Sequence, residues 1–399
     1  MYQFVYSVVI LVTMRKLKTF LFTILLTSTF LYANEPLPEL TIAQDSINSF
    51  ETKLYQMLSE TEGNVNYSAI SIYSLLYALQ KGAQGTTKDQ INQVIDLSPS
   101  QDADSQLKTI ITGTENMTNS LWYKKTLTIQ NDYKAFTKNY DFIIKPTDFY
   151  NGPKVRKEIN SFISKQTDKL IENFLQDDLP LDTQFVLLNT LYFNQKWQKK
   201  FDKHDTKDRT FYISKNQEVQ IPMMCNTTSL RYYEDLDFQA VELVYEDSRY
   251  SMIVFLPRDY DFDFTRLDPN MMLEKFSEQK NRKSVAVYFP KFDITSKYDL
   301  IPVFEKFGMT DAFNPAVCDL SQIFTQSQDI YVDAAIHQVR IMVSETETKA
   351  AAVTMFASKA TAYMPEDPVI FKADHPFLYV IRDNELGINL FTGIVREPK

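Results

Sequence analysis

The sequence of 399 residues predicts an α+β fold with a largely helical first half and a second half rich in strands. Apolar residues recur at helical spacing in the first half, and apolar runs of strand length dominate from residue 185 onward. No linker or repeat interrupts residues 34–399, so we expect them to form a single domain. Hydrophobic residues make up 44% of the chain and aromatic residues 14%, which is enough for one large core.

Four segments of the first half carry helix signals. Residues 46–59 and 155–174 place apolar side chains on one side of a helix. Residues 71–81 form an apolar segment that ends at Gly82, a common helix stop. Residues 87–90, "TKDQ", match a capping box and predict the start of another short helix.

The second half is dominated by strand-like runs. "FVLLNTLYF" at residues 185–193 is nearly all apolar, which is typical of a strand covered on both faces. Shorter strand-like runs follow at residues 239–245, 250–257, 284–294 and 336–343. Residues 299–308 predict a helix closed by Gly308, and residues 376–395 predict a final hairpin around Asp383 and Asn384. These runs predict several large, mostly antiparallel β-sheets.

The N-terminal segment has the anatomy of a signal peptide. A basic start at residues 14–18 is followed by an apolar run at residues 19–33. That run is shorter than the roughly 20 residues that a membrane-spanning helix needs. We expect residues 1–33 to be a signal peptide, with Met14 as an alternative start, and the mature protein to be an exported monomer, extracellular or periplasmic. An uncleaved membrane anchor is the less favoured alternative.

Charge and composition exclude several classes of function. The net charge of −9 and pI of 5.1, with no compensating basic stripe, argue against a nucleic-acid partner. Glycine occurs only 8 times and forms no phosphate-binding motif, so we expect no cofactor. The region after Ile95 is acidic to neutral and offers no site for a heparin-like polyanion. Cys225 and Cys318 are expected to be unpaired thiols.

The sequence contains no visible catalytic or metal-binding machinery. GxSxG, HExxH and CxxC motifs are absent, and there are only 3 histidines. His204 lies in a charged run and is expected at the surface, whereas His337 lies in an apolar strand and is expected to be a hydrogen-bonded core residue. His375 precedes Pro376 at a strand start, where we expect a structural role. These observations predict that the protein is not an enzyme.

Residues 344–368 form an unusual segment, small and alanine-rich, between two strand-like regions. Its charged residues up to position 362 are Glu345, Glu347, Lys349 and Lys359, all with odd numbers, while the even positions are uncharged and mostly small. Because a strand alternates its side chains between two faces, an extended segment would have one face suited to a core and one suited to water. An alanine-rich helix and an exposed loop are the alternative interpretations.

Several motifs in fixed order resemble one family. They are "NVNYSAISIYSLLYALQKGAQGTTKDQI", "LLNTLYFNQKWQKKF", "VQIPMM", "SRYSMIVFLP", "YFPKFDI", "FEKFGMTDAF", "AAIHQVRIMVSE" and "ADHPFLYVIRDNELGINLFTGIVREP". Together they resemble the serpin family from about Ile42 to Pro398. The resemblance implies the serpin fold, with large sheets and an exposed reactive-centre loop at about residues 345–368.

The resemblance also implies a mechanism. A serine endopeptidase, or a cysteine endopeptidase, would attack the loop as a suicide substrate and become acylated. The cleaved loop would then insert into the central sheet as a new strand, by strand addition driven by stored strain. A non-inhibitory carrier or storage protein with the same fold is the alternative function.

The resemblance also implies roles for individual residues. The shutter cluster, which controls opening of the central sheet, corresponds to Ser68, Ser71, Asn189 and His337. The breach cluster, where insertion begins, corresponds to Trp197, Lys291 and Glu345. The hinge corresponds to residues 345–354, with Glu345, Glu347, Thr348, Ala350, Ala351, Ala352 and Thr354 as its key positions. The reactive bond is expected at Thr361–Ala362, with Lys359–Ala360 and Ala360–Thr361 as alternatives.

The hinge departs from the family pattern in ways that matter for function. Glu347 stands where the family has glycine, so we expect slower insertion because backbone freedom is lost. The inward positions Thr348, Ala350, Ala352 and Thr354 are all small and neutral, which favours inhibition. Thr361 before the bond suits an elastase-like or subtilisin-like protease, whereas attack at Lys359 would suit a trypsin-like protease.

Overall fold

The computed structural model describes residues 40–326, 329–345 and 367–398. The described residues from Thr41 onward form one compact unit. The predicted signal peptide and most of the predicted loop therefore lie outside the described residues. Within the described ranges, no helix combines the length and the apolar character that crossing a membrane requires.

The described helices lie mainly in the first half of the chain, as predicted. Their bounds are α2 Thr41–Leu58, α3 Ala69–Gly82, α4 Gly85–Ile95, α5 Gln101–Gly113, α6 Asn131–Asn139, α7 Gly152–Gln166, α8 Pro269–Ser277 and α9 Ile301–Lys306. Short 3₁₀ turns occur at Phe264–Arg266 and Asp311–Phe313.

A nine-stranded sheet contains most of the second half of the chain. Its strands are β1 Val65–Tyr67, β5 Lys207–Ser214, β6 Gln217–Glu234, β7 Phe238–Val244, β8 Tyr250–Pro257, β9 Arg282–Pro290, β12 Val369–Lys372, β13 Phe377–Asp383 and β14 Ile388–Val395. The order is β1-β14-β13-β8-β7-β6-β9-β12, and β5 pairs with β6. Every pairing in it is antiparallel except that of β12 with β9, which agrees with the prediction of mostly antiparallel sheets.

A second, five-stranded sheet has the order β10-β11-β4-β2-β3. Its strands are β2 Met117–Lys124, β3 Ile143–Thr147, β4 Phe185–Phe193, β10 Phe292–Asp299 and β11 Ala334–Val343. Here the pairings alternate, because β11 is parallel to β4 and β2 is parallel to β3, whereas the other two pairings are antiparallel. This sheet is mixed rather than mostly antiparallel.

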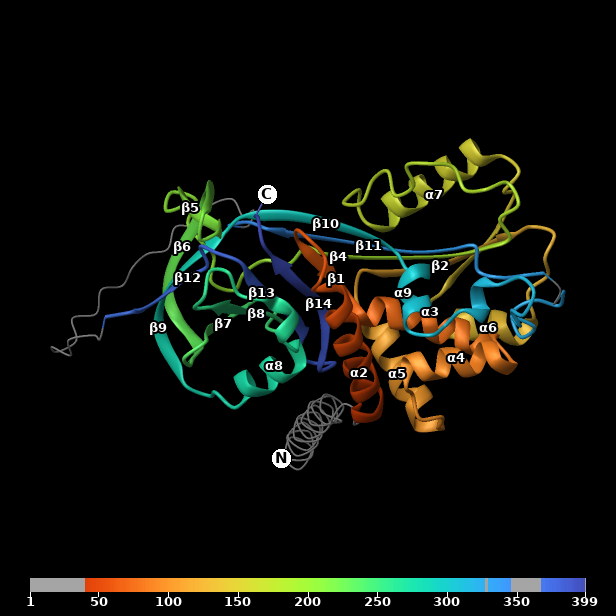
Figure 1. Cartoon of the computed structure of the whole chain (residues 1–399), viewed down its shortest axis with the longest axis horizontal. Coiled ribbons are helices and arrows are strands. Elements are labelled where there is room, and N and C mark those ends of the chain that lie inside the picture. The colour runs from red at the N-terminus through yellow and green to blue at the C-terminus, as the bar shows by residue number, and fades with distance from the viewer. Residues whose placement is uncertain (1–39, 327–328, 346–366, 399) are drawn as a thin grey trace, which may run out of the picture. The chain divides into compact units, whose positions relative to one another are not determined.

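Both faces of the five-stranded sheet are covered by helices. Figure 1 shows α7 on one side of it and α3, α4 and α6 on the other. Val186 and Leu188 of β4 pack with Ile159 and Ile163 of α7 in one buried cluster. The odd-numbered residues of β4 point to the opposite face, because side chains alternate along a strand. The continuous apolar run of residues 185–193 is explained by this double coverage.

Three local predictions differ from the structure. Helix α4 begins at Gly85 rather than after Thr87. The two capping-box side chains bond elsewhere: Gln90 accepts hydrogen bonds from the N–H groups of Thr310 and Asp311, and Thr87 accepts one from the N–H of Asp319. Helix α7 ends at Gln166, well before Phe174. The run at residues 284–294 is divided between β9 and β10 by Lys291, at the passage from one sheet to the other.

A buried carboxyl group joins the first helix to the last strand. Glu51 of α2 is 1% exposed and accepts hydrogen bonds from the side chains of Asn389 and Thr392. Burial raises the pKa of Glu51 from 4.5 to about 7, although both hydrogen bonds oppose this rise. The folded protein therefore holds a proton at Glu51 that the unfolded chain releases at lower pH.

We expect Glu51→Gln to stabilise the protein selectively at alkaline pH. Because the folded pKa is the higher one, the contribution of Glu51 to stability is fully present below pH 4.5 and is lost as pH rises through about 7. The loss amounts to about 3 kcal/mol. The Tm advantage of E51Q over the wild type should grow by several degrees between pH 5 and pH 8. The exposed Glu218→Gln serves as control, and a pH-independent difference would contradict the buried, protonated carboxyl.

Candidate functional site

The parallel pairing of β4 with β11 forms a seam through the centre of the five-stranded sheet. Eight residue pairs align along it, from Val186 opposite Ala334 to Phe193 opposite Ile341. Two consecutive pairs near its middle are polar, Asn189 with His337 and Thr190 with Gln338. Because successive side chains point to opposite faces, the seam is polar on both sides of the sheet.

The structure brings the predicted shutter cluster together on the helix-covered face opposite α7. The Ser68 backbone N–H donates to Nε2 of His337 at 3.3 Å, so Nε2 carries no proton. Nδ1 of His337 therefore holds the proton and donates it to Oδ1 of Asn189 at 2.6 Å. Burial lowers the pKa of His337 to about 3, which keeps the ring neutral at physiological pH.

Two further residues extend the cluster and were not predicted. The Asn189 side chain donates to Oδ1 of Asn119 on β2 at 2.7 Å, and the Ser74 hydroxyl donates to the same oxygen at 3.0 Å. Asn119 lies directly opposite Asn189 in the register of β2 with β4. The sequence signal that could have identified Asn119 is its position as a polar residue within the strand-like run "MTNSLWYK" at residues 117–124. The hydrogen-bond chain thus crosses three strands, from β11 through β4 to β2.

Ser71 takes part only through its backbone. Its N–H donates to the hydroxyl of Ser68, which caps helix α3. The Ser71 hydroxyl is buried without a hydrogen-bond partner among the described residues, as are Oγ1 of Thr190 and Oε1 of Gln338 on the other face. Buried polar atoms without partners are costly, so Oγ1 of Thr190 and Oε1 of Gln338 do not strengthen the hold of β4 on β11.

The predicted breach cluster assembles at the end of the seam, where the chain leaves β11. Nε1 of Trp197 donates to the Ser344 carbonyl at 3.0 Å, and the indole stacks on Tyr245 with ring centroids 4.3 Å apart. Nζ of Lys291 lies 2.9 Å from the Glu345 carboxylate, which also accepts a 2.7 Å hydrogen bond from Thr206. These contacts fix the last described residues before position 346.

The placement of Glu345 contradicts the expectation that the charged residues at odd-numbered positions of this segment face water. It is 4% exposed. Burial alone would raise the pKa of Glu345, but the bonds from Lys291 and Thr206 outweigh burial and lower it. The carboxylate is therefore ionised and acts as a buried anchor at the start of the predicted hinge.

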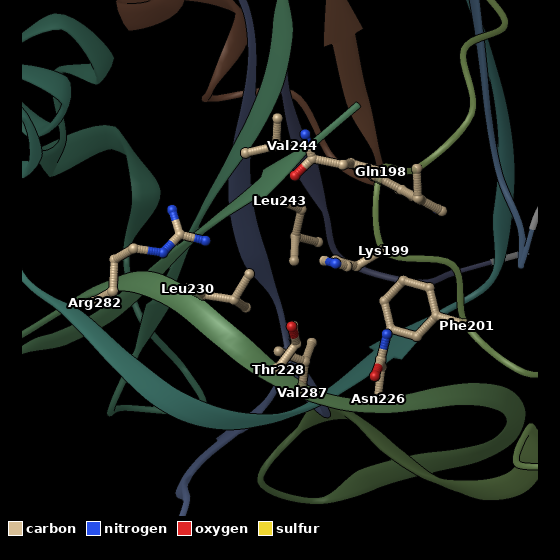
Figure 2. A pocket seen from close by; sticks show the side chains of 11 residues that line it. Gln198, Lys199, Phe201, Asn226, Thr228, Leu230, Leu243, Val244, Arg282 and Val287 are labelled. Atoms are coloured by element: carbon tan, nitrogen blue, oxygen red, sulfur yellow. The ribbon is translucent and has the colours of Figure 1, made fainter. Parts of the chain in front are cut away.

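Two hollows flank Trp197. A cleft of about 760 Å³ opens at the end of the seam between Trp197, Lys291 and Val343. The other pocket is much smaller, with a volume of about 20 Å³. Figure 2 shows Leu230 and Leu243 pointing into it. The larger cleft lies where a chain that turns back from β11 would enter the seam.

The segment after α7 is bonded to both strands of the seam. The Tyr192 hydroxyl of β4 donates to Asp168 at 3.1 Å, and Nη1 of Arg340 on β11 donates to the Leu170 carbonyl at 2.5 Å. Tyr192 and Arg340 lie opposite each other across the seam. Residues 168–170 therefore form a staple across β4 and β11 on the face that α7 covers.

The predicted hinge beyond Glu345 and the predicted reactive bond at Thr361–Ala362 lie outside the described residues. His204 is exposed, as expected, and His375, for which a structural role is predicted, is buried. Cys225 and Cys318 are both unpaired, as predicted. In the part of the chain that the structure describes, no group of histidine, cysteine and carboxylate side chains could hold a metal ion.

These features define an α+β protein with a polar parallel seam and an anchored chain at the end of that seam. A family model described as Serpin (serine protease inhibitor) matches residues 45–398. The chain therefore belongs to the serpin family. The family is described by protease inhibition and not by a catalytic activity, in agreement with the prediction that this protein is not an enzyme.

Named relatives and a solved structure support the assignment. An uncharacterized serpin-like protein of Methanosarcina acetivorans is 32% identical over 370 residues, covering 88% of this chain and 85% of the relative. The leukocyte elastase inhibitor of Equus caballus is 30% identical over 372 residues, covering 88% and 97%. Native protease nexin-1, crystallised with heparin, superposes with a TM-score of 0.80 at 25% identity, covering 90% and 100%.

We expect the ion pair of Lys291 with Glu345 to stabilise the fold measurably. Lys291→Gln and Glu345→Gln should each lower Tm, and their combination should lower it by less than the sum, with a coupling of about 1 kcal/mol. The pair of Lys215 with Asp259 is the control, because its side chains are both 57% exposed and such pairs couple weakly. Equal coupling in the two pairs would contradict a special anchoring role for Glu345.

Proposed function

We propose that this protein inhibits serine endopeptidases as a suicide substrate, through loop cleavage, acyl-enzyme formation and insertion of the loop into the five-stranded sheet. Cysteine endopeptidases are a further target class. The observation that carries this proposal is the parallel seam of β4 and β11, with the chain anchored at its end by Trp197 and Glu345.

The topology of the seam suits strand insertion. A chain that turns back after leaving β11 runs antiparallel to β11. Because β4 is parallel to β11, the same chain would also run antiparallel to β4. Insertion would thus replace one parallel pairing by two antiparallel pairings, which are somewhat more stable for each residue. About a dozen new backbone hydrogen bonds at about 0.5–1.5 kcal/mol each give a gain on the order of 10 kcal/mol.

The proposed target is a protease with a small apolar specificity pocket. The expected reactive bond follows Thr361, and the relative from Equus caballus is named an inhibitor of leukocyte elastase. Elastase-like and subtilisin-like proteases are therefore favoured. A trypsin-like target would follow if Lys359 were the attacked residue. We further propose that the protein is exported, on the basis of residues 14–33.

The test is to mix residues 34–399 with elastase, subtilisin and trypsin in separate reactions. We expect a band at the summed mass that survives denaturing electrophoresis, and a released C-terminal peptide that begins at Ala362. The cleaved inhibitor should also melt at a higher temperature. Cleavage near Thr361 without a covalent band and without a rise in Tm would instead support the carrier or storage function.

A hinge substitution tests insertion separately from recognition. Thr348→Arg places a charge at a position that the sequence predicts to face the core after insertion. This variant should be cleaved at the wild-type rate but form little covalent complex, because insertion becomes too slow to precede deacylation. Lys349→Arg is the matched control at a position predicted to face solvent, and it should behave as the wild type. Equal trapping by all three proteins would refute insertion by the hinge.

The staple at residues 168–170 should resist opening of the seam. If the proposed insertion occurs, Tyr192→Phe removes one of the two bonds that hold the staple across β4 and β11. Loss of one hydrogen bond should favour opening by about two-fold or more. The yield of covalent complex relative to cleaved inhibitor should rise accordingly, whereas the exposed control Tyr150→Phe should leave it unchanged. An unchanged yield for Y192F would show that the staple does not oppose insertion.

A further inference from the structure

One side-chain carboxyl group closes the end of the seam at which β4 and β11 both begin. Oδ2 of Asp333 accepts hydrogen bonds from the backbone N–H groups of Gln184 at 2.8 Å and Phe185 at 2.9 Å. The N–H of Asp333 donates in return to the Phe185 carbonyl oxygen at 2.9 Å. Phe185 is the first residue of β4, and Asp333 immediately precedes β11. We call Asp333, Gln184 and Phe185 the seam clamp.

The two N–H groups of the clamp are held in place by contacts on the β4 side. Phe185 is fully buried, and its ring packs edge-on against Phe324 with centroids 5.2 Å apart. The Gln184 carbonyl accepts from the Lys124 N–H at the end of β2 at 2.8 Å, and the Gln184 side chain donates to the Asp329 carbonyl at 2.7 Å. The Asp333 carboxyl group therefore binds a pair of donors whose positions are already fixed.

The clamp makes the two ends of the seam unequal. At the end where the chain leaves β11, the cleft beside Trp197 leaves room for a returning chain. In the middle, Oγ1 of Thr190 and Oε1 of Gln338 have no hydrogen-bond partner within the described ranges. At the clamp, by contrast, separating the strands would leave two N–H groups without their acceptor, which is costly. A chain that enters at the cleft would therefore meet the clamp last.

Sequence distances place the clamp at the end of the insertion path. Asp333 precedes Glu345 by about 12 residues, and neighbouring strands have nearly the same rise per residue. A chain that turns back after Glu345 would therefore come level with Asp333 after about as many residues, near position 357. The expected reactive bond at Thr361–Ala362 follows only a few residues later. A protease attached there would reach the clamp in the last step of insertion.

We propose that Asp333 is a positioning residue of the suicide reaction, whose clamp holds this end of the seam closed and opens only when the cleaved chain inserts fully. This inference rests on the proposed function. A strand inserted between β4 and β11 would separate Asp333 from Phe185 by about one further strand spacing, 4.7–4.9 Å, which no hydrogen bond spans. The clamp therefore stabilises the uncleaved protein and is lost in the cleaved, inserted form.

The test compares melting temperatures before and after cleavage of the loop. The cleaved protein is made with elastase or trypsin, separated from any covalent complex, and checked by mass spectrometry for a cut between residues 359 and 362. Asp333→Ala should lower the Tm of the uncleaved protein by roughly 2–4 °C, because two N–H groups lose their acceptor. It should leave the Tm of the cleaved protein unchanged, so the rise on cleavage exceeds the wild-type rise by the same amount.

Asp235 provides a matched control in the other sheet. Its Oδ1 accepts from the N–H groups of Asp237 and Phe238, both at 2.8 Å, in the turn between β6 and β7. Asp235→Ala should lower the Tm of both forms equally, as a purely structural aspartate would. Asp333→Asn keeps an acceptor oxygen and should lie between the wild type and Asp333→Ala. It also allows the comparison if Asp333→Ala does not fold.

The outcomes separate the clamp from the proposed function. A wild-type Tm that rises on cleavage, with equal rises in both Asp333 variants, would overturn the clamp and leave insertion intact. A wild-type Tm that does not rise would overturn insertion itself, and the clamp with it. The yield of covalent complex relative to cleaved protein should also increase about two-fold or more in Asp333→Ala and stay unchanged in Asp235→Ala. An unchanged yield in both would show that Asp333 has no role in the reaction.

Discussion

The pairing of β4 with β11 is the constraint on which the rest of this structure depends. The two strands are parallel neighbours, and the pairs Asn189–His337 and Thr190–Gln338 make the middle of their seam polar. At the candidate site, three sets of polar contacts hold the seam or the chain at its end. The shutter cluster bridges it on one face, the staple at residues 168–170 bridges it on the other, and the breach cluster holds the chain at the end where it leaves β11.

Much of the fold could be predicted from the sequence because the hydrophobic period is strong. The run at residues 185–193 matches β4 residue for residue, and residues 250–257 match β8. Predictions failed where tertiary contacts competed with local signals. Thr87 and Gln90 match a capping box, yet both side chains accept hydrogen bonds from the backbone of the segment after α9. The parallel direction of β11 and β4 could not be predicted from residues alone, because strand direction depends on how distant segments meet.

The site was predictable only in part, for a related reason. His337 and Asn189 stand out as polar residues within apolar runs, and family resemblance supplies their role. Asn119 carries the same signal more weakly, and its contribution appears only when β2 is aligned with β4. Glu345 shows the limit of pattern arguments. Its odd number suggested a solvated face, but Lys291, which lies far away in the sequence, makes burial of the carboxylate favourable.

The two unpaired thiols have a consequence for the conditions in which the protein can fold. No covalent cross-link contributes to the described fold, so its stability does not depend on the redox poise of the surroundings. Burial raises the pKa of the Cys318 thiol to about 12, which leaves almost no thiolate to react with oxidants or disulfides at neutral pH. The domain can therefore reach the same structure in a reducing or an oxidising compartment, without an oxidase or an isomerase.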